Sequence, residues 1–203
     1  MMQNPTPLIV LASASIARQA LLTAAGVAFT TEPGRVDEDA VKQSARAGNA
    51  TAEDAALLLA ELKAARVAGR RPDALVIGAD QILVCDGNWF DKPADLAAAR
   101  AQLLLLRGKT HVLATAVLCQ RGGQRVWHHV AQPRLTMRAF SDGFLDDYLA
   151  AEGDRVLGSV GAYRLESLGV HLFDRIEGDH STILGLALLP LLGFLRQHGV
   201  LTV

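Results

Sequence analysis

The chain has 203 residues, of which 50% are apolar and 20% are charged. This composition excludes an intrinsically disordered protein, which needs low hydrophobicity and high net charge, and it predicts one globular domain over residues 1–203. Twenty Lys and Arg residues against 21 Asp and Glu residues leave a formal net charge of −1, so we expect no polymeric nucleic acid as a partner. A small charged substrate is compatible with this balance.

The cysteines and the apolar stretches predict a cytoplasmic protein with no membrane partner. Cys85 and Cys119 are too few and too far apart for a disulfide scaffold or a zinc site, and their apolar surroundings predict buried thiols. No basic stretch precedes the first apolar run. The longest apolar stretch, from Ile183 to Leu195, is shorter than the roughly 20 residues that span a bilayer.

The N-terminal half alternates predicted strands with predicted helices. An apolar run predicts a buried strand over 8–12, and a serine-rich turn leads from it into a helix over 16–25. The expected inward face of this helix consists of Ile16, Ala20, Leu21 and Ala24. The elements that follow are an extended segment over 29–36, a capped helix over 52–68, a strand over 74–85, its hairpin return over 88–90 and a helix over 93–106.

The C-terminal half is richer in hairpins, which predicts a mixed sheet with flanking helices and hence an α/β fold. The expected elements are strands over 111–120, 124–129 and 134–138, a helix over 142–151, short strands over 159–165 and 170–176, and a last helix over 182–198 that Ser181 opens. The size of the chain also allows two lobes around a cleft.

The order strand, serine-rich turn, helix predicts an anion site near the start of the chain. Backbone N–H groups and the hydroxyls of Ser13 and Ser15 come together at a helix N-terminus. Arg18, in the first turn of the helix, adds a positive charge to the same place.

Asp80 is a charged residue in the middle of the apolar strand over 74–85. An isolated charge there is unfavourable unless it is paired or bound to a cation. Two interpretations stay open, a hydrogen-bonded structural aspartate and a catalytic or metal-binding carboxylate.

Four other charged residues break the local pattern, although each has an ordinary interpretation as surface charge. Lys63 lies on an Ala/Leu helix, Lys92 precedes a proline, Glu38 stands in an acidic loop and Glu166 ends a glycine-rich segment. Cations, carboxylates and hydroxyls in this mixture suit a polyphosphate bound together with Mg²⁺ or Mn²⁺.

Several segments match a known family in the same order along the chain: LASASIARQALL (11–22), ELKAA (61–65), IGADQILV (77–84), DKP (91–93) and GSVGAYRLESLGVHLFDRIEGDHSTILGLALLPLL (158–192). They resemble the Maf family, the septum-formation-inhibitor-like nucleoside triphosphate pyrophosphatases. The resemblance implies a fold like that of the inosine triphosphate pyrophosphatases. It also implies hydrolysis of (d)NTPs, including modified nucleotides, to a monophosphate and pyrophosphate with a divalent cation, a homodimer and a link to septation.

The resemblance also assigns roles to residues. Asp80 corresponds to the proton acceptor, and Lys63 and Lys92 to the other catalytic positions. The implied phosphate and substrate contacts are Ser13, Ser15, Arg18 and Gln81, and the implied metal ligands are Glu38, Asp80 and Glu166.

The chain departs from the family pattern in its first motif, which usually reads S-P-R-R, because Ile16 and Ala17 replace the proline and the first arginine. Gln81 and Glu166 are similar to the branch that acts on methylated GTP. The segment 161–163 is instead similar to the branch that acts on dTTP and UTP, so the preferred base stays open. Two alternative functions stay open as well: a non-catalytic nucleotide-binding regulator of cell division, which Ala17 favours, and a nucleotidyltransferase.

Overall fold

The computed structural model describes residues 3–202 and divides into two compact units. Unit 1 contains the chain up to Gln81, then 115–131 and the chain from Asp179 onward, and unit 2 contains 82–114 and 132–178. This division agrees with the two lobes expected from the sequence. No helix within residues 3–202 is long and apolar enough to cross a membrane.

Eight strands form a mixed sheet in the order β2-β1-β3-β5-β7-β8, with β4 paired to β3 and β6 paired to β5. The strands are β1 (Ile9–Leu11), β2 (Thr30–Thr31), β3 (Leu75–Cys85), β4 (Asn88–Phe90), β5 (Thr110–Arg121), β6 (Gln124–Ala131), β7 (Arg134–Met137) and β8 (Phe173–Glu177). Strand β1 pairs in parallel with β2 and β3, whereas the pairs β3–β4, β5–β6, β5–β7 and β7–β8 are antiparallel. The predicted α/β class with a mixed sheet is confirmed.

The helices fall into two groups by unit. Those of unit 1 are α1 (Ile16–Ala24), α2 (Glu38–Ala47), α3 (Ala52–Ala68), α6 (His180–Ile183) and α7 (Leu188–Gln197). Those of unit 2 are α4 (Leu96–Leu106), α5 (Asp142–Glu152) and the 3₁₀ turns η1 (Gly153–Gly158), η2 (Val160–Ala162) and η3 (Leu168–Leu172).

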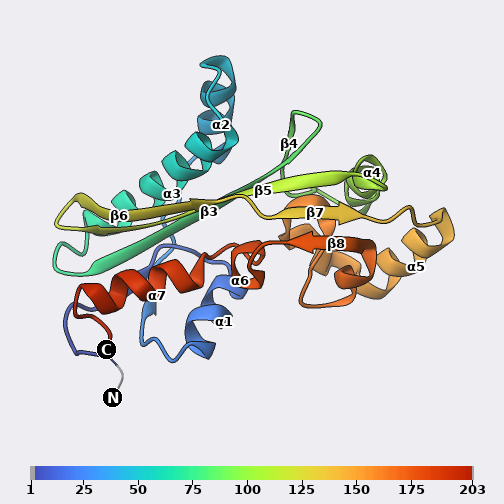
Figure 1. Cartoon of the computed structure of the whole chain (residues 1–203). Coiled ribbons are helices and arrows are strands. Elements are labelled where there is room, and N and C mark those ends of the chain that lie inside the picture. The colour runs from blue at the N-terminus through green and yellow to red at the C-terminus, as the bar shows by residue number, and fades with distance from the viewer. Residues whose placement is uncertain (1–2, 203) are drawn as a thin grey trace. The chain divides into compact units, whose positions relative to one another are not determined.

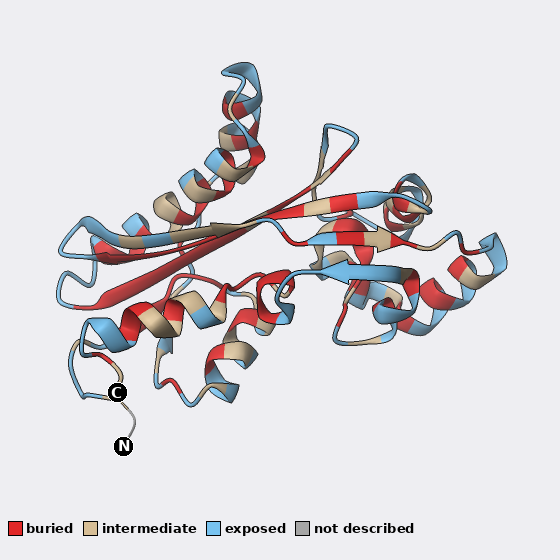
Figure 2. Cartoon of the chain, in the orientation of Figure 1, coloured by how far each residue is buried: buried red, intermediate tan, exposed pale blue. Residues whose placement is uncertain are grey.

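Helices cover both faces of the strands in unit 1, with α3 on one face and α1 and α7 on the other (Figure 1). For this reason β3 is buried along almost its whole length (Figure 2), as its continuous apolar run predicts. The core of this unit includes Leu11, Leu22, Ile77, Leu186 and Leu195. Cys85 and Cys119 are buried, as predicted.

In unit 2 the turn at Asp86-Gly87 joins β3 to β4, and Leu83 lies opposite Phe90. This confirms the predicted hairpin. Helices α4 and α5 pack against each other and against η1. The side chains of Leu103 and Leu145 are fully buried, which makes them part of this unit's own core.

Two of the predicted C-terminal elements are wrong. The segment 159–165 contains the 3₁₀ turn η2 and no strand, because Gly161 has a φ of +77° that an extended strand does not allow. Of the expected strand over 170–176, only the part from Phe173 is extended, and it continues to Glu177 as β8.

The expected last helix is divided into α6 and α7. Gly185, between them, has a φ of +96°, outside the helical region. Asp179 caps α6 through the backbone N–H of Thr182, so Ser181, which was expected to open the helix, lies inside it.

The N-terminal expectations also differ from the structure in three places. The acidic loop after 29–36 is the start of helix α2, which Asp37 caps, and only Thr30–Thr31 of the extended segment forms a strand. Helix α1 buries Arg18 and Leu22 rather than the predicted apolar stripe, since Ile16 is 83% exposed.

Candidate functional site

Three segments of unit 1 bring Glu38, Lys63 and Asp80 together. The Lys63 ammonium lies 2.7 Å from Glu38 Oε1 and donates a hydrogen bond to Asp80 Oδ1. The Asp80 side chain is only 7% exposed, whereas that of Glu38 is 45% exposed. Asp80 is therefore a buried carboxylate that is paired with a cation, as the cost of an isolated buried charge requires.

Two glycines allow these segments to approach helix α3 closely. A Cβ atom on Gly78 of β3 would lie 2.2 Å from the carbonyl oxygen of Ala60, and one on Gly34 would lie 2.0 Å from the carbonyl oxygen of Lys63. Both distances are too short for any side chain. The strand that carries Asp80 and the segment that leads to Glu38 thus contact the backbone of α3 directly.

Replacing Gly78 with Ala is expected to lower the free energy of unfolding by about 1–3 kcal/mol, because the added methyl group pushes against helix backbone. Urea denaturation measures this loss. The matched control is Gly143→Ala, where a Cβ has open space and where alanine is the better helix former. Equal stability of the two variants would show that α3 moves away from β3 without cost.

Arg18 is buried and donates hydrogen bonds to three segments of unit 1, at Ser13, Ala79 and Gly185. Its Nε donates to the Gly185 carbonyl at 2.8 Å, and its Nη1 donates to the Ala79 carbonyl at 2.8 Å and to Ser13 Oγ at 3.2 Å. Burial lowers the pKa of Arg18, and the negative charges of Asp80 and Glu38 oppose that shift. Because Ala79 precedes Asp80, the hydrogen bond from Arg18 to the Ala79 carbonyl fixes the backbone next to this carboxylate. The Nη2 group of Arg18 takes part in none of these three contacts.

The hydroxyls of the two serines of the predicted anion site accept backbone N–H groups at the start of α1, which Ser15 caps. Ser13 Oγ accepts from the backbone N–H of Ser15, and Ser15 Oγ accepts from the backbone N–H of Arg18. Since Ser13 Oγ also accepts from Arg18 Nη1, both of its lone pairs are used and its own proton remains as a donor.

Gln81 lies on the opposite face of β3 from Asp80, because successive strand residues alternate. Its Nε2 donates to Thr115 Oγ1 at 2.7 Å and to the Thr182 and Ile183 carbonyls at 3.2 Å each. These acceptors fix the orientation of the amide, so that its Oε1 points away from them.

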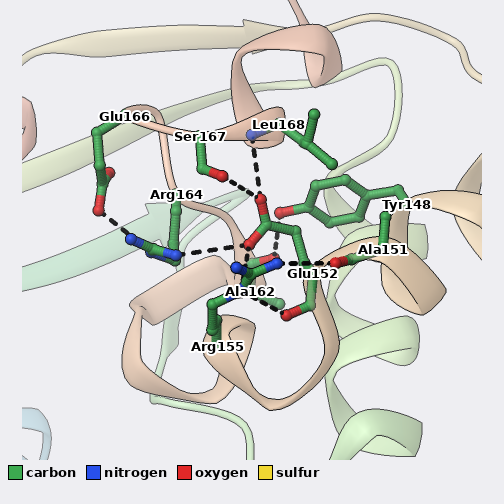
Figure 3. Close-up of polar contacts among 9 residues, drawn as sticks. All are labelled: Tyr148, Ala151, Glu152, Arg155, Ala162, Arg164, Glu166, Ser167 and Leu168. Carbon is green, nitrogen blue, oxygen red and sulfur yellow. Dashed lines mark hydrogen bonds and ion pairs between the residues drawn. The ribbon is translucent and has the colours of Figure 1, made fainter.

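Lys92 and Glu166 belong to unit 2, whereas Glu38, Lys63 and Asp80 belong to unit 1. Lys92 is exposed between β4 and α4. Glu166 Oε1 accepts from Arg164 Nε at 3.2 Å (Figure 3). The roles that the resemblance gives these two residues stay predictions.

Glu152, at the end of α5, anchors the segment that carries Glu166 (Figure 3). Its Oε1 accepts from Ser167 Oγ at 2.5 Å and from the Leu168 N–H at 3.1 Å. Its Oε2 lies 3.6 Å from Arg164 Nη1. The side chain of Glu152 is fully buried, so its hydrogen bonds hold Ser167 and Leu168 against the end of α5.

The carboxylates of unit 1 fit a divalent cation that takes its other ligands elsewhere. Within residues 3–202, no three His, Cys, Asp or Glu side chains are grouped closely enough to hold a metal. Mg²⁺ commonly binds through one or two carboxylates and completes its shell with water and substrate phosphates. Glu38 and Asp80, which share one lysine, provide such a pair.

Sequence reasoning missed several residues of these clusters. Lys42 is buried, with its Nζ 3.9 Å from Glu38 Oε2, and the spacing of four residues would have indicated this contact if α2 had been predicted as a helix. A glycine inside a strand, such as Gly78, was a further available signal of close backbone approach. No local signal indicates the contacts of Thr115 or Glu152.

The fold and this cluster define an α/β protein whose charged site joins a strand, a helix and a helix N-terminus. The family model described as Maf-like protein matches residues 8–198, and the chain belongs to the Maf family.

Similar curated proteins match almost the whole chain. A nucleoside triphosphate pyrophosphatase of Granulibacter bethesdensis is 59% identical over 96% of this chain and 99% of its own. One of Rhodospirillum rubrum is 55% identical over 96% of each chain. A 7-methyl-GTP pyrophosphatase of Rhizobium meliloti is 47% identical over 96% of this chain and 98% of its own.

Among solved structures, lipoprotein GNA1162 of Neisseria meningitidis covers 75% of this chain and 100% of its own, with a TM-score of 0.29 and 13% identity. So distant a likeness carries no argument about this chain.

Proposed function

We propose that this protein hydrolyses nucleoside triphosphates to a nucleoside monophosphate and pyrophosphate. The observation that carries the proposal is the contact of Lys63 with both Asp80 and Glu38 in a chain that belongs to the Maf family. The activity in the names of its relatives at 59% and 55% identity supports the same chemistry.

In this reaction Asp80 accepts the proton of the water that attacks the α-phosphorus. Lys63 pairs with the Asp80 carboxylate while no nucleotide is bound, and it neutralises charge on the phosphates once the nucleotide is bound. The Ser13 hydroxyl and the Nη2 group of Arg18 are the donors available to phosphate oxygens. Positioning and charge neutralisation supply most of the rate enhancement, as in other phosphoryl transfers. Lys92 is the other lysine to which the family resemblance gives a catalytic role.

Glu38 and Asp80 would hold the divalent cation, Mg²⁺ or Mn²⁺, with Glu166 as the third proposed ligand. When bound, such a cation stabilises negative charge on phosphate oxygens and on the leaving pyrophosphate.

Purified protein, Mg²⁺ and a panel of nucleoside triphosphates test the proposal. We expect pyrophosphate and monophosphate in equal amounts, and no product after a chelator is added. Binding without product would favour the non-catalytic regulator, which the alanine at position 17 supports. A conjugate formed with an acceptor, instead of free monophosphate, would indicate a nucleotidyltransferase.

The same panel addresses the base, since it includes 7-methyl-GTP, dTTP and UTP. The resemblance of Gln81 and Glu166 to one branch of the family favours a methylated guanine, and the 7-methyl-GTP pyrophosphatase at 47% identity adds support. The resemblance of the segment 161–163 to the other branch keeps dTTP and UTP as alternatives. The homodimer, the cytoplasmic location and the link to septation are parts of the same proposal. Light scattering coupled to gel filtration tests the homodimer.

A further inference from the structure

Lys63 occupies the position between the carboxylates of Glu38 and Asp80. Its ammonium contacts an oxygen of each, and the side chains of Lys63 and Asp80 are 12% and 7% exposed. Because the contact between Lys63 and Asp80 is largely shielded from water, these two charges interact more strongly than they would at the surface. A cation that binds through Glu38 Oε1 and Asp80 Oδ1 must displace this ammonium.

Two positive side chains besides Lys63 act on these carboxylates. Lys42 lies 3.9 Å from the second oxygen of Glu38, and the charges of Asp80 and Glu38 act on Arg18. These positive charges oppose the approach of a free divalent cation and attract the negative charge of a triphosphate.

We propose that Lys63 is the resident counter-ion of Glu38 and Asp80 and keeps divalent cations away from them until a nucleoside triphosphate binds. The phosphates then attract the ammonium, and both carboxylates become available to the cation that arrives with the nucleotide. The nucleotide step rests on the proposed function. The exclusion of divalent cations from the nucleotide-free protein does not depend on the proposed function.

The test is a double-mutant cycle that measures Mn²⁺ affinity without nucleotide, by the electron paramagnetic resonance signal of free Mn²⁺. Lys63→Met is expected to bind Mn²⁺ at least about tenfold more tightly than the wild type, since a positive charge in direct contact with both carboxylates is removed. Adding Glu38→Gln to this variant is expected to abolish the gain. In the wild-type background, Glu38→Gln is expected to leave Mn²⁺ affinity unchanged, because Lys63 already masks that carboxylate.

Lys109→Met is the matched control. This lysine is paired with Asp86 in unit 2, so the same change of total charge is expected to leave Mn²⁺ affinity within about twofold of the wild type. Lys63→Arg keeps the positive charge and is expected to keep the low affinity.

Two results would overturn the proposal: no gain of affinity in folded Lys63→Met, or weaker Mn²⁺ binding when Glu38→Gln is introduced into the wild type. The second comparison decides even where Lys63→Met does not fold. Neither measurement requires turnover. A protein that fails to release pyrophosphate but passes the cycle contradicts the proposed function alone.

Discussion

Asp80→Asn is expected to lower the rate of pyrophosphate release by about 10²–10⁴-fold, the usual loss when a general base is removed. Asparagine has nearly the shape of aspartate and keeps an oxygen that accepts the Lys63 hydrogen bond. It cannot take up a proton from water at neutral pH. The steady-state rate with saturating nucleotide and Mg²⁺ measures the effect.

Two further measurements separate chemistry from folding in this variant. Nucleotide binding, followed by calorimetry, is expected to persist, because Arg18 and Ser13 are unchanged. Asp174→Asn, at an exposed position of β8, controls for the change of charge and is expected to turn over like the wild type. Wild-type turnover by Asp80→Asn would remove Asp80 from the role of proton acceptor.

Glu152→Ala is expected to lower the free energy of unfolding by about 2–4 kcal/mol, the largest effect on stability that we anticipate. The substitution leaves the Ser167 hydroxyl and the Leu168 N–H without the acceptor that they share. It also removes the negative charge near Arg164 and Arg155. Denaturation in guanidinium chloride, with the slope compared between variants, measures the loss.

Glu152→Gln separates the hydrogen bonds from the charge, because it keeps a carbonyl oxygen for Ser167 and Leu168. Its expected loss is smaller than that of the alanine variant. Asp147→Ala, at an exposed position of the same helix, is expected to stay within about 0.5 kcal/mol of the wild type. A Glu152→Ala variant as stable as Asp147→Ala would show that the buried carboxylate does not hold this segment.

Local sequence patterns predicted the structure correctly where one property, such as continuous hydrophobicity, dominated a segment. The continuous apolar run of β3 predicted a buried strand, and the cost of an isolated charge inside it predicted that Asp80 is either paired or bound to a cation. Helix α2 was missed because most of its residues are polar and only Lys42 and Ala45 are buried. The segment 159–165 was mistaken for a strand because its apolar residues outweighed the requirement of Gly161 for a positive φ.

Contacts between residues distant in sequence could not be predicted from such patterns. Arg18 meets a carbonyl 61 residues away and another 167 residues away, and no local periodicity contains that information. The resemblance to a family predicted Arg18 as a phosphate contact, but it gave no indication that the carbonyls of Ala79 and Gly185 accept hydrogen bonds from its guanidinium.

The alternation of side chains along β3 has a consequence for divergence within the family. Asp80 faces Lys63 on one side of the strand, while its neighbour Gln81 faces Thr115 and Thr182 on the other. Mutations can therefore change the surroundings of the Gln81 amide while the contact between Asp80 and Lys63 is unchanged. Adjacent codons are thus free to evolve at different rates, one under tight constraint and the other open to new selectivities.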